Sequence, residues 1–224
     1  MEGPGKVTEG SIAVDPSSVA VEQDPTGDRF RSIANGYIAS LNAKLGRLDV
    51  DALLRIVARL RAARDAGAMV FIAGNGGSAA TASHWVNDLG KATRSSGRRP
   101  FRVIGLVDNV PWFSALANDE GYERVFAGQL ENLAQAHDVV ILISASGNSP
   151  NLIRAVDHAR GARMTSIALL GFDGGQLLKK VDEAFWVPTP NGAYGLVESI
   201  HSVACDIVTS CLIDDRPAEP LANR

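Results

Sequence analysis

Apolar residues near the N-terminus fall into two helical stripes. From Asp28 onward they recur every three or four positions, until Gly46 interrupts the pattern. A second stripe follows, with Asp49 or Asp51 as its N-cap. The pattern predicts a hairpin of two antiparallel helices over residues 28–67, in which each helix has an apolar face that another surface must cover.

Beyond this hairpin the pattern changes to short apolar runs that alternate with glycine-containing turns and helical segments. Such runs are typical of a parallel sheet with helices on both faces. The sequence therefore predicts an α/β fold, a three-layer α-β-α sandwich, with a mixed α+β fold as the alternative. The expected strands cover residues 68–73, 101–107, 138–143, 164–170 and 183–187, and the expected helices end near residues 91, 161 and 214.

The composition indicates a soluble globular protein. Of the 224 residues, 46% are hydrophobic and 21% are charged, which supplies enough apolar side chain for a core. A net charge of −3 argues against a nucleic-acid partner held through a broad basic surface. No purely apolar run approaches the ~20 residues of a membrane span, and the first residues do not resemble a signal or transit peptide. We therefore expect a cytoplasmic protein with no membrane partner.

One domain is expected over residues 28–214. Residues 1–27 mix Gly, Pro, Ser, Thr and acidic residues without an apolar period, which predicts a disordered tail, and residues 215–224 form a C-terminal tail. The two cysteines, Cys205 and Cys211, lie on different faces of one helical pattern, about 9 Å apart along its axis. They cannot pair without breaking that helix, so no disulfide is expected.

A glycine-rich turn, Gly74-Asn75-Gly76-Gly77-Ser78, connects the first strand to a helix. Ligands of parallel sheets bind at this edge, where helix N-termini offer free N–H groups and a partial positive charge. Glycine lets the backbone approach an anion closely, and Asn75 and Ser78 add side-chain donors. The spacing matches neither the dinucleotide fingerprint nor the P-loop, and a plain tight turn is the alternative interpretation.

A second turn, residues 144–149 (SASGNS), connects a later strand to a helix that begins at Pro150. Its three hydroxyl groups surround one glycine at a helix N-terminus. Such a cup of neutral donors suits a phosphate monoester held without a metal, although an N-cap with spare serines is the alternative. Together the two turns predict a phosphate site.

The combination of motifs resembles the sugar isomerase (SIS) domain family. GNGGSA, NDEGYERVF and SASGNS are together similar to its phosphoheptose isomerase branch, which includes a relative that binds the bacterial replication initiator; the resemblance covers roughly residues 29–213. It implies a five-stranded parallel sheet and a homotetramer with active sites between subunits, with the N-terminal helix pair in the interface. It also implies interconversion of sedoheptulose 7-phosphate and D-glycero-D-manno-heptose 7-phosphate through an enediol.

The same resemblance assigns residues to the substrate. Ser78, Ser144, Ser146 and Ser149 match the phosphate-binding serines, Gly76 and Gly77 belong to the first binding turn, and Asn75 and Asp108 match positions that touch sugar hydroxyls. Ala145 stands where the family usually has Thr, which removes one hydroxyl contact.

The catalytic positions depart from the family pattern. The family's His and Glu on the helix after the first turn correspond to His84 and Asp88, and the shorter carboxylate can cost roughly 10²-fold in rate. Some members bind zinc there with a Gln and a His from the last helix, where this chain has Val197 and Cys205, with His201 on the same face. We expect Asp88 to act as base and His201 as acid. Candidate zinc ligands are His84 and Asp88 with Cys205 or His201.

Three functions are compatible with these residues. The first is a phosphosugar aldose–ketose isomerase of the heptose type. The second is a non-catalytic SIS module that binds a phosphosugar or a partner protein, which the altered Glu and His positions favour. The third is an isomerase of a different sugar phosphate. A core cysteine and a packed helix histidine are the alternative interpretations of Cys205 and His84.

Overall fold

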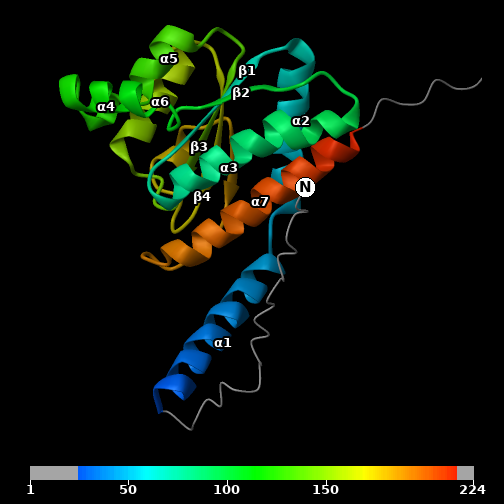
Figure 1. Ribbon diagram of the computed structural model, residues 1–224, viewed down its shortest axis with the longest axis vertical. Coiled ribbons are helices and arrows are strands. Elements are labelled where there is room, and N and C mark those ends of the chain that lie inside the picture. The colour runs from blue at the N-terminus through cyan, green and yellow to red at the C-terminus, as the bar shows by residue number, and fades with distance from the viewer. Residues whose placement is uncertain (1–24, 216–224) are drawn as a thin grey trace, which may run out of the picture. The chain divides into compact units, whose positions relative to one another are not determined.

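The computed structural model describes residues 25–215 (Figure 1). The expected tails at residues 1–24 and 216–224 lie outside the described residues. Of the described residues, those from 25 to 39 belong to one unit and those from 40 to 215 to another, which contains the whole sheet. The elements are α1 (Pro25–Leu45), α2 (Val50–Ala66), β1 (Met69–Gly74), α3 (Gly77–Lys91), β2 (Arg102–Gly105), α4 (Val110–Asp119), α5 (Ala127–Leu133), β3 (Val139–Ser144), α6 (Pro150–Gly161), β4 (Thr165–Leu170), β5 (Glu183–Trp186) and α7 (Tyr194–Asp214), with short 3₁₀ helices at Ala92–Ser96, Tyr122–Arg124 and Leu177–Lys179.

The five strands form one parallel sheet in the order β2-β1-β3-β4-β5. This confirms the α/β fold and the five-stranded parallel sheet. β1 and β3 are neighbours in the sheet but not in the chain, and Val70 of β1 aligns with Val139 of β3. The chain turns to opposite faces of the sheet after these two strands, so a crevice opens outside their carboxyl ends.

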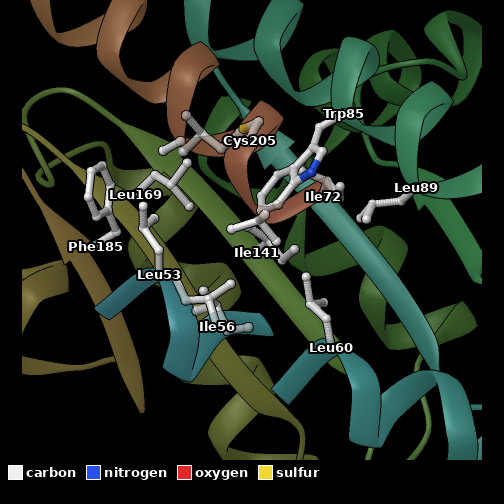
Figure 2. Packing of buried hydrophobic residues seen from close by; sticks show 14 of the residues in the cluster. Leu53, Ile56, Leu60, Ile72, Trp85, Leu89, Ile141, Leu169, Phe185 and Cys205 are labelled. Atoms are coloured by element: carbon white, nitrogen blue, oxygen red, sulfur yellow. The ribbon is translucent and has the colours of Figure 1, made fainter. Parts of the chain in front are cut away.

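Helices cover both faces of the sheet. On one face α2, α3 and α7 pack against alternate strand residues such as Ile72, Ile141 and Leu169, as Figure 2 shows for part of this cluster. On the other face α4, α5 and α6 pack against residues such as Phe71 and Leu142. Since successive strand residues point to opposite faces, a continuous apolar run fills two cores at once.

Local signals set the ends of α2. The side chain of Asp49 accepts a hydrogen bond of 2.9 Å from the Ala52 N–H, which confirms it as the N-cap. Gly67 adopts a left-handed conformation at the other end, where its N–H bonds the last carbonyls of the helix. Helices α4 and α5 were not predicted from the sequence, although Asn109 caps α4 through a 3.2 Å bond from the Trp112 N–H.

α7 is long and apolar enough to cross a membrane by length and composition alone. In this fold it is a core helix, because its apolar face packs against α2, α3 and the sheet. Val197 of α7, for example, is completely buried and packs in a small apolar cluster with Ala145 and Phe172. Tertiary packing therefore accounts for the hydrophobicity of α7.

His201 is a completely buried polar residue of α7. Neither ring nitrogen has a hydrogen-bond partner of normal geometry among the described residues. Burial lowers the pKa of His201 to about 4, although the nearby Leu170 carbonyl favours the charged ring. The unfolded imidazole has a pKa of about 6.5, so protons bind the unfolded chain more tightly. The free energy of unfolding should therefore fall as the pH decreases from about 6.5 toward 4.

Replacing His201 with leucine should remove this decrease in the free energy of unfolding at low pH. The wild-type protein should lose about 2 kcal/mol between pH 7.5 and pH 5 through this residue, and His201→Leu should lose almost none of it. Urea unfolding at the two pH values measures the difference, with His158→Gln as a control on another helix. Equal pH dependence in wild type and His201→Leu would contradict the assignment.

Candidate functional site

The two polar turns predicted to bind phosphate lie side by side. The first follows β1 and the second follows β3, and these strands pair directly, with Gly74 aligned to Ile143. The first turn leads into α3 and the second into α6, so two helix N-termini face the same crevice. The structure thus brings together two turns that are about 70 residues apart in the chain.

A pair of asparagine side chains ties the first turn to the start of α6, which directly follows the second turn. Asn75 Nδ2 donates to Asn151 Oδ1 at 3.0 Å, and Asn151 Nδ2 donates to Asn75 Oδ1 at 2.9 Å. Asn151 is only 1% exposed, and its Oδ1 also accepts from the Leu152 N–H. The Tyr122 hydroxyl donates to Asn75 Oδ1 at 2.9 Å. Both amides are therefore well satisfied, and Asn75 is fixed at the rim of the crevice.

The crevice is a cleft of about 290 Å³. Both turns line it, and the start of α7 closes one side. Most of the lining groups are uncharged hydrogen-bond donors, which is the donor type expected for a phosphate held without lysine or arginine. The lining residues are Asn75, Gly76, Gly77, Ser78, Ile143, Ser144, Ala145, Ser146, Ser149, Tyr194 and Glu198.

The serine hydroxyls of the second turn are free to donate into the cleft. Ser144 Oγ accepts a 3.0 Å bond from the Gly147 N–H, which leaves its own O–H available. Ser149 is the N-cap of α6 but makes no side-chain capping bond. Gly147 has φ 63°, and a Cβ there would overlap the Gly174 carbonyl oxygen. The turn can therefore keep this close packing only with glycine at its tip.

The first turn faces a carboxylate. Gly76 and Gly77 open α3 without a side-chain cap, and a Cβ on Gly77 would overlap the carboxyl group of Glu198 from α7. Glu198 carries the only carboxyl group among the described residues that line the cleft. A carboxylate at a helix N-terminus is stabilised by the helix dipole, so Glu198 can cap α3 electrostatically while the cleft holds no anion.

Asp108 does not line this cleft. Its Oδ1 accepts a 2.5 Å hydrogen bond from the Ser83 hydroxyl of α3, and it lines a separate cavity of about 430 Å³ beside β2. The structure therefore places Asp108 next to α3 in a cavity other than the cleft, and its contact with sugar hydroxyls stays a prediction.

The candidate metal ligands of α3 meet a different residue of α7 from the one expected. His84 Nε2 lies 3.3 Å from Asp88 Oδ2, and the ligand atoms of His84, Asp88 and Asp206 all lie within 4.8 Å of one another. These residues fit a divalent cation, because an imidazole and two carboxylates converge from two helices.

The other two candidates of α7 face the interior. Cys205 is 4% exposed and packs in the apolar core beside Trp85 (Figure 2). Burial, together with the charges of Asp206 and Asp88, raises the pKa of the Cys205 thiol. His201 is completely buried and does not line the cleft. The structure thus brings His84 and Asp88 together but gives neither Cys205 nor His201 an open path to a sugar.

Comparison with known proteins agrees with this geometry. A model of the SIS domain matches residues 36–171. The chain belongs to the SIS domain family. A probable phosphoheptose isomerase of Thermoplasma acidophilum is 32% identical over 189 residues, which cover 84% of this chain and 99% of that relative. The phosphoheptose isomerase of Trichlorobacter lovleyi is 40% identical over 146 residues, which cover 63% of this chain and 73% of the relative.

Solved structures of the SIS domain family show the same architecture. The phosphoheptose isomerase of Francisella tularensis superposes with a TM-score of 0.76 at 26% identity, over 86% of this chain and all of its own. The enzyme of Neisseria gonorrhoeae gives a TM-score of 0.74 at 26% identity, over 84% of this chain and 98% of its own. The resemblance seen in the sequence motifs is confirmed.

Four residues at or near the site were not predicted from the sequence. Asn151 and Tyr122 fix Asn75, Glu198 faces the first turn, and Asp206 completes the cluster with His84. Glu198 stands at the Glu of the family's Gln-Glu pair and Asp206 directly follows Cys205, but the sequence pattern assigned neither of them to the site. Their orientation depends on how α7 packs against α3, which no local pattern shows.

Breaking the asparagine pair should weaken both the fold and the cleft. Asn151→Ala leaves the amide of Asn75 short of a partner, so the free energy of unfolding should fall by about 1–3 kcal/mol. Affinity for a sugar phosphate should also fall, although Asn151 does not line the cleft. Urea unfolding and calorimetric titration measure the two effects, with Asn118→Ala on the exposed surface as the control. Unchanged affinity in a folded Asn151→Ala protein would show that the pair does not position the turn.

Proposed function

We propose that this chain is a phosphoheptose isomerase, which interconverts sedoheptulose 7-phosphate and D-glycero-D-manno-heptose 7-phosphate. The observation that carries the proposal is the single cleft built by two uncharged turns at the carboxyl ends of paired strands. Relatives that are 32% and 40% identical carry the name phosphoheptose isomerase or probable phosphoheptose isomerase. The cleft and the similarity to these relatives both support a phosphorylated sugar as the substrate.

The phosphate group belongs at the two helix N-termini. Backbone N–H groups of Gly76 and Gly77 and the hydroxyls of Ser78, Ser146 and Ser149 surround the same space. The partial positive charge at the starts of α3 and α6 favours the anion. Glu198 must turn away or share the space through a bound water when the phosphate enters, because two anions repel each other at this distance.

The distance along α3 fits a long sugar. His84 and Asp88 lie six and ten residues beyond Ser78, which corresponds to about 9 and 15 Å along the helix axis. An extended seven-carbon chain has six C–C bonds of ~1.5 Å and spans ~8 Å in zigzag before the phosphate is added. A heptose phosphate can therefore place its first two carbons near His84 while its phosphate stays in the cleft. A triose phosphate is too short to reach both.

Asp88 is the proposed base. Aldose–ketose isomerisation removes a proton from C1 of the ketose and returns a proton to C2, with an enediol between the two steps. Asp88 is held by the 3.1 Å bond from Asn87 Nδ2 to Oδ1, and its Oδ2 faces His84. Proton transfer by a positioned carboxylate contributes about 10²–10⁴-fold to a rate. Since His201 is buried, we propose that the protein takes up the open-chain sugar, and we assign His201 no proton transfer.

A divalent metal ion, with zinc as the first candidate, completes the proposed site. Such an ion would act as a Lewis acid that polarises the carbonyl group of the sugar. His84 and Asp88 would hold it from α3. Asp88 would then be oriented by both the ion and Asn87, which narrows the positions that its carboxylate can take.

A homo-oligomer, with a tetramer as the first candidate, accounts for the surface of α1. Phe30, Ile33, Tyr37 and Ile38 lie along this helix and are 42–62% exposed. Helical stripes of this kind usually pack against another surface. We propose that a second copy of the chain covers the stripe, and that the assembly acts in the cytoplasm.

A binding module without turnover is the second candidate function. Val197 and Cys205, which replace a polar and a basic residue of the family pattern, favour it. The purified chain should be incubated with sedoheptulose 7-phosphate, with and without added zinc, and followed by NMR in D₂O. An isomerase produces aldose signals and incorporates deuterium through the enediol. Binding without either change would establish the module and overturn the isomerase.

Removal of one cleft hydroxyl should weaken substrate binding. Ser146→Ala deletes a donor to a charged ligand, a contribution of about 1.5–3 kcal/mol, so the affinity for sedoheptulose 7-phosphate should fall roughly 10- to 100-fold. Titration calorimetry measures the change, and Ser114→Ala, on the exposed part of α4, serves as the control. Equal affinity in the two variants would place the phosphate elsewhere.

Neutralising the proposed base should separate turnover from binding. Asp88→Asn keeps the size of the side chain but removes its basicity, so turnover should fall by about 10²–10⁴-fold. Phosphosugar affinity should change little, because the phosphate contacts lie at the other end of α3. A coupled assay for the aldose and a separate titration measure the two quantities. Retained activity would show that another group is the base.

A further inference from the structure

The outer faces of α3 and α7 carry a cluster of three side chains. His84 and Asp88 lie one turn apart on α3, and Asp206 faces them from α7. The two helices are held in this register by the buried bond from Trp85 Nε1 to Thr209 Oγ1, at 3.1 Å. Trp85 follows His84 directly in α3. Because the buried side chain of Trp85 is held in the core, the exposed side chain of His84 is fixed on the outer face of the helix.

The distances in the cluster are close to those of a metal site. Four-coordinate zinc binds nitrogen and oxygen at about 2.0–2.2 Å, so neighbouring ligand atoms lie roughly 3.3–3.6 Å apart. His84 Nε2 and Asp88 Oδ2 already lie 3.3 Å apart. All three ligand atoms lie within 4.8 Å, and His84 and Asp206 are exposed and free to rotate inward by the remaining ~1 Å.

One ligand is already oriented by a neighbour. Asn87 Nδ2 donates to Asp88 Oδ1 at 3.1 Å, which leaves Oδ2 directed at His84. Hydrogen bonds from outside the coordination sphere commonly fix a ligating carboxylate in this way. The three ligand atoms of the cluster are therefore close together, and one of the two carboxylates is also held in a fixed orientation.

The thiol of Cys205, the residue before Asp206 in α7, packs in the apolar core. Cys205 is 4% exposed and belongs to the cluster of apolar residues around Trp85. Consecutive residues of a helix point about 100° apart, so Cys205 and Asp206 cannot both face His84. The packing of α7 directs the cysteine inward and the aspartate outward.

The geometry points to His84, Asp88 and Asp206 as the ligands of one divalent metal ion, with Asp206 in the place that the family motif gives to Cys205. This inference deepens the proposed function. It rests on that function only for the role of the metal in the isomerisation. One imidazole and two carboxylates form a harder ligand set than one that contains a thiolate. The site should accept zinc, manganese or iron(II) and should show no special preference for cadmium.

Metal binding by the full chain, without any sugar, tests the inference. Chelator-treated protein is titrated with Zn²⁺ by calorimetry and with Co²⁺ by absorption spectroscopy. We expect one ion per chain, an affinity at least ~10²-fold lower in Asp206→Asn, and a change of less than ~3-fold in Cys205→Ser. Bound Co²⁺ should lack the near-ultraviolet charge-transfer band of a thiolate ligand.

Asp214→Asn is the matched control, because it removes the same charge from the exposed surface of the same helix. Equal loss of affinity in Asp206→Asn and Asp214→Asn would overturn the assignment, as would a thiolate band, a large loss in Cys205→Ser, or no metal binding. Thermal melting without metal confirms that the variants fold. If metal binds as expected but no isomerisation occurs, the metal site stands and the proposed function fails. Isomerisation by a chain that binds no metal would overturn the metal site and leave the proposed function intact.

Discussion

The reciprocal hydrogen bonds between Asn75 and Asn151 are the constraint on which the rest of the site depends. They join the first turn to the start of α6 directly after the second turn, and each turn alone offers only part of the proposed anion site. Two amides that satisfy each other resist separation, because parting them would leave the buried amide of Asn151 without its partner. The phosphate cleft is thus a consequence of one side-chain pair as well as of the strand order.

This cleft has no basic side chain among its described lining residues, and it even includes the carboxylate of Glu198. Under the proposed function, the attraction for a phosphate would come from backbone N–H groups, hydroxyls and two helix dipoles, which act only at short range. Such a site discriminates by shape and by the number of donors it satisfies. A phosphate ester with three free oxygens fits that requirement better than a carboxylate, which can accept fewer bonds.

The sequence predicted the layers of the fold, all five strands to within a few residues, and both turns. It could do so because strands of a parallel sheet are continuous apolar runs and because glycines and serines mark the turns. It missed α4 and α5, because the segment around them was interpreted only as a family motif. It proposed Cys205 or His201 as the ligand from α7 and did not select Asp206. Cys205 and Asp206 point about 100° apart on α7, and the packing of Trp85 against Thr209 fixes which of the two faces His84.

The same packing explains how this chain can differ from the family pattern at two positions of α7. Val197 and Cys205 are both buried, so the positions that the family pattern fills with polar residues here strengthen the core. Burying a polar group without a partner is costly, as the two unpaired ring nitrogens of His201 already illustrate. Under the proposed assignment, a metal would instead be held from α7 by Asp206, the residue after Cys205, where solvent can stabilise the charge of the carboxylate. Two consecutive residues of a helix differ by only about 1.5 Å along its axis. An aspartate side chain is long enough to make up that difference, so a metal ligand can shift from one position to the next.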